Sequence, residues 1–88
     1  MYATSADWSF TNTPDFSEQE AVFTANMKAA GAIHWYYVLT SETTARSMVI
    51  WPDQATAHKS LKMVRDEAAA ENNQAIVSVC EGKIVAGF

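Results

Sequence analysis

The sequence predicts an α+β domain in which two helices pack on one face of an antiparallel sheet. The first observation is the order of its segments, because extended and helical patterns follow one another as β-α-β-β-α-β. The second is that glycine, proline and short polar breaks fall between these segments. The third is size, since 88 residues with a hydrophobic fraction of 49% hold one packed core. We therefore expect a single domain over residues 1–88.

The first half of the chain is expected to form a strand and then a helix. Aromatic residues alternate with polar ones in Ala6–Asn12, which indicates a strand. Ser17 followed by Glu20 matches a capping box, so we expect Ser17 to be the N-cap of a helix over Ser17–Ala30. Gly31 is the expected end of this helix, because glycine tolerates the left-handed conformation found there.

A β-hairpin and a second helix are expected next. Ala32–Thr40 and Thr44–Trp51 are rich in β-branched and aromatic residues, and a short polar loop separates them. Pro52 ends the second of these strands, since proline has no amide hydrogen for the ladder. Asp53 is a suitable N-cap for a helix over Gln54–Glu71.

The end of the chain is expected to complete the sheet. Ile76–Cys80 is the next predicted strand, and Gly82–Lys83 suits a tight turn into a short strand over Ile84–Phe88. Together the elements give the split-βαβ, ferredoxin-like arrangement with a short C-terminal hairpin arm. Right-handed crossovers place both helices on the same face of the sheet.

Composition excludes several classes of function. The formal net charge of −4 disfavours binding to a phosphate backbone, so no nucleic-acid partner is expected. No apolar run approaches the length of a membrane span, and no signal peptide is expected. Cys80 is the only cysteine, which rules out an intrachain disulfide and the usual zinc ligand sets. We expect a cytoplasmic protein without a metal site, in which Cys80 packs in an apolar strand.

Both faces of the central hairpin are apolar. A strand with one solvated face alternates between apolar and polar residues, and these strands do not. In the first strand Trp35 and Tyr37 point one way, and His34, Tyr36 and Val38 point the other. In its partner Val49 and Trp51 share one face, and Met48 and Ile50 share the other. Two helices cover only one face, and soluble monomers rarely expose a large apolar patch, so we expect a homodimer through the sheet face. Arg46 is the polar exception in this hairpin, and we expect it to pair with Glu42 or Glu81.

These features together resemble the dimeric α+β barrel superfamily. The resemblance rests on the β-α-β-β-α-β order, the apolar second face of the sheet, and the run Val49–Ala55, which leads from a strand through Pro52 into a helix. It implies two ferredoxin-like subunits that pack sheet to sheet into a closed barrel. The superfamily includes antibiotic-biosynthesis monooxygenases, haem-degrading monooxygenases and many small uncharacterised proteins.

The resemblance also suggests candidate catalytic residues. Haem-degrading and quinol-oxidising members often use an Asn on the first strand, a Trp near the end of the third and a His on the second helix. Asn12, Trp51 and His58 lie in roughly these places, so the resemblance makes Asn12 and His58 the candidate catalytic residues and haem the candidate cofactor. The alternative for His58 is a half-buried residue with one satisfied nitrogen.

Aromatic residues supply the candidate ligand site. We expect a site between the helices and the sheet near Trp51 and His58, with Trp35, Tyr37 and His34 as further ligand-binding residues. The alternative is that these side chains only pack in the core or in a dimer interface. Two functional classes remain open. One is a dimeric barrel that binds a small apolar or aromatic molecule, and the other is a cofactor-independent or haem-linked monooxygenase.

Overall fold

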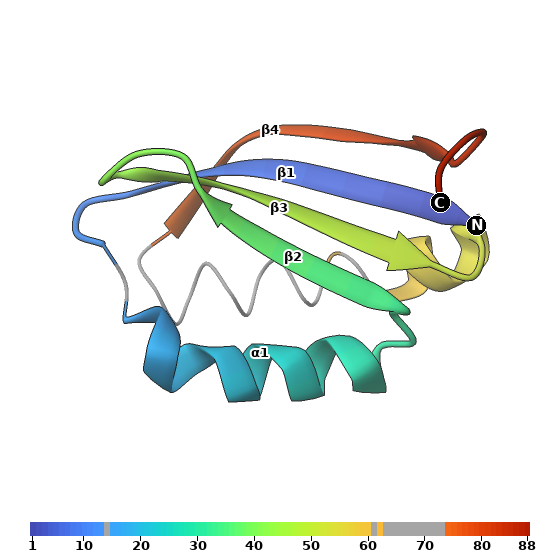
Figure 1. The fold of residues 1–88 in the computed structure, drawn as a ribbon, viewed down its shortest axis with the longest axis horizontal. Coiled ribbons are helices and arrows are strands. Elements are labelled where there is room, and N and C mark those ends of the chain that lie inside the picture. Colours follow the sequence, from blue (N-terminus) through green and yellow to red (C-terminus); the bar gives the residue numbers. More distant parts are fainter. Residues whose placement is uncertain (14, 61, 63–73) are drawn as a thin grey trace.

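The structure is a computed structural model that describes residues 1–13, 15–60, 62 and 74–88. One four-stranded sheet is packed against helices that lie on a single side of it (Figure 1). The elements are β1 (Tyr2–Phe10), α1 (Phe16–Ala29), β2 (His34–Leu39), β3 (Thr44–Trp51) and β4 (Gln74–Lys83). A second helix begins after β3 and includes residues 54–60, so the predicted order β-α-β-β-α-β is confirmed. The later part of the helix expected over Gln54–Glu71, residues 63–71, lies outside the described residues.

β1 is longer than the sequence predicts and lies at the centre of the sheet. The strand order is β2-β3-β1-β4, and all neighbouring strands are antiparallel. The expected strand Ala6–Asn12 begins too late, because pairing starts at Tyr2, which lies opposite Trp51 on one side and Lys83 on the other. Two partner strands supply ladder hydrogen bonds to residues whose own β-propensity is modest.

α1 begins one residue earlier than expected and has a different cap. Asp15 is the N-cap, and its Oδ1 accepts a hydrogen bond from the amide of Ser17 at 3.0 Å. The prediction of Ser17 as N-cap was therefore wrong, because the preceding carboxylate is in extended backbone and reaches the amides of the first turn. Gly31 does follow the end of the helix, with φ of 95°. A β-carbon at Gly31 would lie 2.9 Å from Cγ2 of Thr56, so α1 ends against the start of the second helix.

The second helix starts where the sequence predicts. Oδ1 of Asp53 accepts a hydrogen bond of 2.7 Å from the amide of Thr56, which is the geometry of an N-cap. This backbone hydrogen bond is the main cause of the lowered pKa of the Asp53 carboxyl. Ala57 is fully buried against Val49 and Trp51, so the first turn of the helix closes one end of the core.

The C-terminal hairpin arm is not formed. β4 runs straight through Gly82 and Lys83, which pair with Ala3 and Tyr2 of β1, and residues 84–88 are not in a strand. The predicted turn at Gly82–Lys83 was wrong because the early start of β1 offers a ladder partner to both residues. Glycine followed by lysine favours a turn only where no such partner is present.

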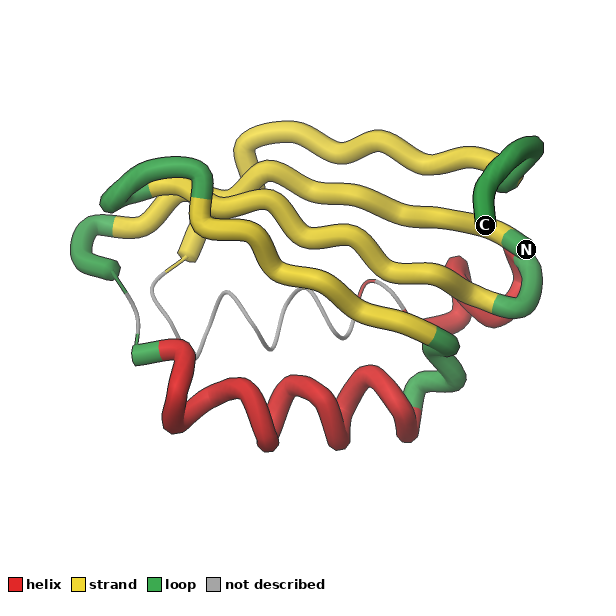
Figure 2. Tube along the Cα trace, viewed as in Figure 1, coloured by secondary structure: helices red, strands yellow, loops and turns green. Residues whose placement is uncertain are grey.

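The two faces of the sheet differ in what covers them. Both helices lie on one side (Figure 2), which we call the helix face. Buried side chains of this face are Thr4, Ala6, Trp8, Phe10, Ala45, Ser47, Val49 and Trp51. The register of the hairpin puts Trp35 and Tyr37 on this face too, since Trp35 lies opposite Val49 and Tyr37 opposite Ser47. The other side, the outer face, has no covering element in the described part of the chain. No described helix is long and apolar enough to cross a membrane.

Candidate functional site

An aromatic pocket lies between α1 and the edge strand β2. It has a volume of about 310 Å³, and the aromatic residues that line it are Phe16 and Phe23 from α1 and Trp35, Tyr36 and Tyr37 from β2. Phe16 and Phe23 are seven residues apart, close to two helical turns, so both project toward the sheet. Trp35 and Tyr37 are two residues apart on a strand and therefore share the helix face. Of the residues predicted to bind a ligand, the structure brings Trp35 and Tyr37 together here.

The rings of this pocket are set at angles to one another. The ring centroids of Phe23 and Trp35 are 6.0 Å apart at an interplanar angle of 75°, and those of Phe16 and Tyr37 are 5.3 Å apart at 50°. The Tyr37 hydroxyl donates a hydrogen bond to Oε1 of Gln74, the first residue of β4. Burial raises the pKa of Tyr37, so the phenol stays protonated and can donate this hydrogen bond.

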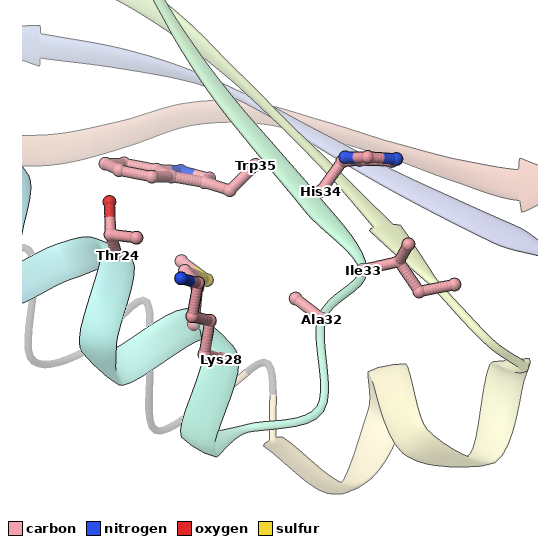
Figure 3. Close-up of a pocket in the computed structure, with 7 residues that line it drawn as sticks. Thr24, Lys28, Ala32, Ile33, His34 and Trp35 are labelled. Carbon is pink, nitrogen blue, oxygen red and sulfur yellow. The ribbon is translucent and has the colours of Figure 1, made fainter.

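A second hollow of about 160 Å³ continues the pocket toward the C-terminal end of α1. Thr24 and Trp35 line both spaces, and Met27, Lys28 and Ala32 line the smaller one. Figure 3 shows the Trp35 indole above the Thr24 hydroxyl and the Lys28 amine, both of which rise from α1. We call the two hollows together the α1–β2 groove.

His34 is among the residues that line the smaller hollow, but its imidazole points away from the Trp35 side of β2. Its side chain lies on the opposite side of β2 from Trp35 (Figure 3), and its ring stacks at 6.3 Å on that of Tyr36. This follows from strand alternation, which sends neighbouring side chains to opposite faces. His34 therefore belongs to the outer face.

Trp51 lies in the core and exposes no surface in this structure. Its relative exposure is 0%, and its Nε1 donates a hydrogen bond of 2.9 Å to Oγ1 of the buried Thr4. A ligand stacks only on a ring with an accessible face, and Trp35 has one whereas Trp51 does not. In the sheet, Trp51 lies beside Tyr2.

His58 belongs to a polar cluster at the same end of the sheet. Its Nε2 lies 2.7 Å from Oε1 of Glu81, which also accepts a hydrogen bond of 2.8 Å from the Tyr2 hydroxyl. The rings of Tyr2 and His58 meet edge to face at 5.9 Å. Partial desolvation first, and then the Glu81 carboxylate, raise the pKa of Tyr2. Sequence reasoning missed both partners, because only the register of β1 with β4 brings them to His58.

Asn12 is remote from this cluster. It is exposed and follows the C-terminal end of β1, whereas His58 contacts Tyr2 at the N-terminal end. At about 3.3 Å per residue the nine residues of β1 separate these ends by roughly 26 Å. The described residues thus unite neither Asn12 with His58 nor an accessible Trp51 face with a histidine. They do not fit a haem, and we derive no step through one.

The outer face carries a polar network within apolar surroundings. Nε of Arg46 donates a hydrogen bond to Oδ1 of Asp7 and Nη2 donates one to Oδ2, both at 2.9 Å. The Ser78 hydroxyl donates a third to Oδ2 at 2.7 Å. The Arg46 bonds are the largest cause of the lowered pKa of Asp7, followed by the Ser78 bond. The prediction that Arg46 pairs with Glu42 or Glu81 was wrong, because Asp7 lies directly opposite Arg46 in the β1–β3 ladder.

Cys80 also differs from its expected place. Its thiol is free and exposed, whereas the sequence predicted packing in an apolar strand. Cys80 is on β4, an edge strand of the sheet, where it lies opposite Ser5 of β1. An apolar strand is buried only where a second layer covers it, and none of the described residues forms such a layer on the outer face.

Comparison with known proteins identifies the fold. No protein-family model matches the chain, and no curated protein matches its sequence. Solved structures do match. SnoaB from Streptomyces nogalater, described as a cofactor-independent oxygenase, gives a TM-score of 0.75 at 9% identity, over 99% of this chain and 95% of that one. A dimeric ferredoxin-like protein from an uncultured marine organism gives 0.66 at 13% identity, over 100% and 98%.

This chain has the ferredoxin-like fold. A third structure agrees, a candidate antibiotic biosynthesis monooxygenase from Deinococcus radiodurans, with a TM-score of 0.63 at 11% identity over 100% of this chain and 96% of that one. The resemblance to dimeric ferredoxin-like proteins that the sequence suggested is thus confirmed for the architecture. At these identities the ferredoxin-like fold is what the chains share, and function has to be argued from the site.

Proposed function

We propose that the protein binds a small flat aromatic molecule in the α1–β2 groove. The observation that carries this proposal is the pocket of about 310 Å³, which is lined by five aromatic residues, Phe16, Phe23, Trp35, Tyr36 and Tyr37. Small-molecule pockets start at about 300 Å³ and are lined mainly by apolar and aromatic side chains. The size favours a ligand of one or two fused rings. The angled rings of Phe23 and Trp35 offer both face and edge contacts, which aromatic ligands use.

A neutral probe tests the groove without involving charge. We expect 2-naphthamide to quench tryptophan fluorescence, because Trp35 is partly exposed whereas Trp8 and Trp51 are buried. In calorimetry, Trp35→Ala and Phe23→Ala should each weaken binding. The matched control is Val22→Ala, next to Phe23 on α1 and 49% exposed. Binding that survives both aromatic substitutions would place the site elsewhere, and the absence of binding to the folded protein would refute the proposal.

We also propose that a second copy of the chain covers the outer face. Three apolar side chains of this face are exposed in the single chain. Tyr36 and Val38 of β2 are each 55% exposed, and Met48 of β3 is 41% exposed. Fully covering such a side chain contributes about 1.5–3 kcal/mol. Asp7 already neutralises Arg46 within one chain, so two copies can meet face to face without leaving either charge unpaired. The similarity to a dimeric ferredoxin-like protein supports the same arrangement.

Sedimentation at micromolar concentration tests the dimer. We expect twice the monomer mass for the wild type and a shift toward monomer for Val38→Glu, which places a charge in the proposed interface. Val22→Glu introduces the same charge on α1, outside the proposed interface, and should leave the mass unchanged. A wild-type monomer under these conditions would refute the homodimer.

The free thiol of Cys80 suits a reducing compartment, and we propose a cytoplasmic location.

A cofactor-independent oxygenase is a second candidate function. The observation that favours it is the structural similarity to SnoaB, which is described as such an oxygenase and covers 99% of this chain. The groove would then hold an electron-rich aromatic substrate instead of a stable ligand. The test is oxygen uptake with a quinol probe in metal-free buffer. Uptake above the protein-free rate that falls in Trp35→Ala supports an oxygenase, and uptake equal to the protein-free rate leaves the binding function alone.

A further inference from the structure

The α1–β2 groove has one aromatic end and one end that carries a cation. The larger hollow is lined by Phe16, Phe23 and Tyr37, and the smaller one by Lys28. Thr24 and Trp35 line both, so a single flat molecule that lies along α1 contacts the two ends at once. The groove therefore has a direction, and the direction constrains what it binds.

Three polar side chains lie along the same side of α1. Glu20, Thr24 and Lys28 are spaced four residues apart, which places them one above another on a helix. Glu20 lines the aromatic hollow, Lys28 lines the smaller hollow, and Thr24 lies between them. An acid, a hydroxyl and an amine thus follow one another along the floor of the groove.

The amine end has two donors with no partner among the described residues. Within the part of the chain that the structure describes, neither Lys28 nor the Thr24 hydroxyl makes a hydrogen bond or ion pair. The Lys28 amine and the Thr24 hydroxyl both point toward the Trp35 indole (Figure 3). An ammonium donates up to three hydrogen bonds and a hydroxyl donates one, so together they match the oxygens of a carboxylate.

We propose that the ligand of the α1–β2 groove is an aromatic carboxylic acid. Its ring would lie against Trp35 and the phenylalanines, and its carboxylate would accept hydrogen bonds from Lys28 and Thr24. Charge-assisted bonds of this kind are stronger than those between neutral groups. Glu20 repels the same carboxylate at the opposite end, so only one orientation along α1 is favourable. This inference rests on the proposed aromatic-binding function and adds the charge of the ligand to it.

Three probes of one shape test the inference. They are 2-naphthoate, 2-naphthamide and 2-naphthylmethylamine, which carry a negative, a neutral and a positive group on the same ring system. We expect the acid to bind about tenfold more tightly than the amide, the size of one partly exposed charge-assisted contact. Rising salt should weaken binding of the acid and leave binding of the amide unchanged, because salt screens the interaction between exposed charges.

Variants identify the group that recognises the charge. Lys28→Met should remove the preference for the acid and leave amide binding as it is, whereas Lys28→Arg should keep the preference. Thr24→Val should weaken binding of the acid by a few-fold, since one neutral hydrogen-bond donor is lost. The matched control is Lys59→Met, which removes an exposed lysine of the second helix that does not line the groove. Circular dichroism checks that each variant is folded.

Each outcome decides between the two proposals. Equal binding of acid and amide, or tightest binding of the amine, would overturn the aromatic acid as ligand while the aromatic-binding function stands. A preference for the acid that survives Lys28→Met would also overturn it, because another group would then receive the carboxylate. Failure of all three probes to bind the folded protein would overturn the proposed function itself.

Discussion

The buried hydrogen bond between Trp51 and Thr4 makes a sharp stability prediction. Thr4→Val keeps nearly the same shape but removes the hydroxyl that accepts the hydrogen bond from the Trp51 indole N–H. Both side chains are at most 1% exposed. A buried donor left without a partner costs about 1–3 kcal/mol. In a domain of this size each kcal/mol lowers Tm by about 4–8 °C. We therefore expect a fall of roughly 5–20 °C.

The assay is thermal unfolding followed by circular dichroism at one fixed protein concentration, because a dimer makes Tm depend on concentration. Thr11→Val is the control, since it makes the same chemical change at an exposed position after β1. A double-mutant cycle with Trp51→Phe isolates the hydrogen bond, and the second substitution should cost about 1 kcal/mol less once the first is present. A Thr4→Val variant as stable as the control, or an additive cycle, would refute the reasoning.

Three further predictions concern charges and helix ends. The fold lowers the pKa of Asp7, so its contribution to stability is present above the unfolded pKa of about 3.9 and is lost at lower pH. Urea titrations should show that the difference in stability between wild type and Asp7→Asn shrinks from pH 7 to pH 3. A difference that stays constant would contradict this. Asp15→Ala should cost about 0.5–2 kcal/mol in chemical denaturation, and Ser17→Ala should cost less, because the cap is the carboxylate. Gly31→Ala should cost about 1–2 kcal/mol from its positive φ alone. If Thr56→Ser, which removes the clashing methyl, restores none of the loss, the 2.9 Å contact contributes nothing.

Much of the fold was predictable because its signals are local. The hairpin, Gly31 after α1 and the Asp53 cap each depend on residues within one or two turns of chain. The errors arose where a distant strand decides. β1 starts at Tyr2 and β4 continues through Gly82 because each offers the other a ladder partner some eighty residues away, which no local pattern reveals.

The candidate site was predictable in kind but not in place. Aromatic residues of the hairpin marked a pocket, and the structure places Trp35 and Tyr37 in it. The sequence also singled out Trp51 and His58. Trp51, which lies in the core, and Trp35, which lines the groove, both occur in apolar strands, so the sequence pattern does not distinguish them. Which of them keeps an accessible face depends on how α1 crosses the sheet. The same holds for Lys28, whose proposed role follows only from its position below the Trp35 indole.

The central place of β1 has a consequence for how the chain folds. Its partners in β4 are the most distant in sequence, since Phe10 pairs with Gln74 and Tyr2 with Lys83. The sheet therefore has a high contact order, and the loss of chain entropy on closing so long a loop precedes the gain from pairing. During synthesis β1 emerges first and waits with one ladder edge unpaired until β4 is made. We expect folding to be slow for a domain of this size, with aggregation through that edge as the competing event.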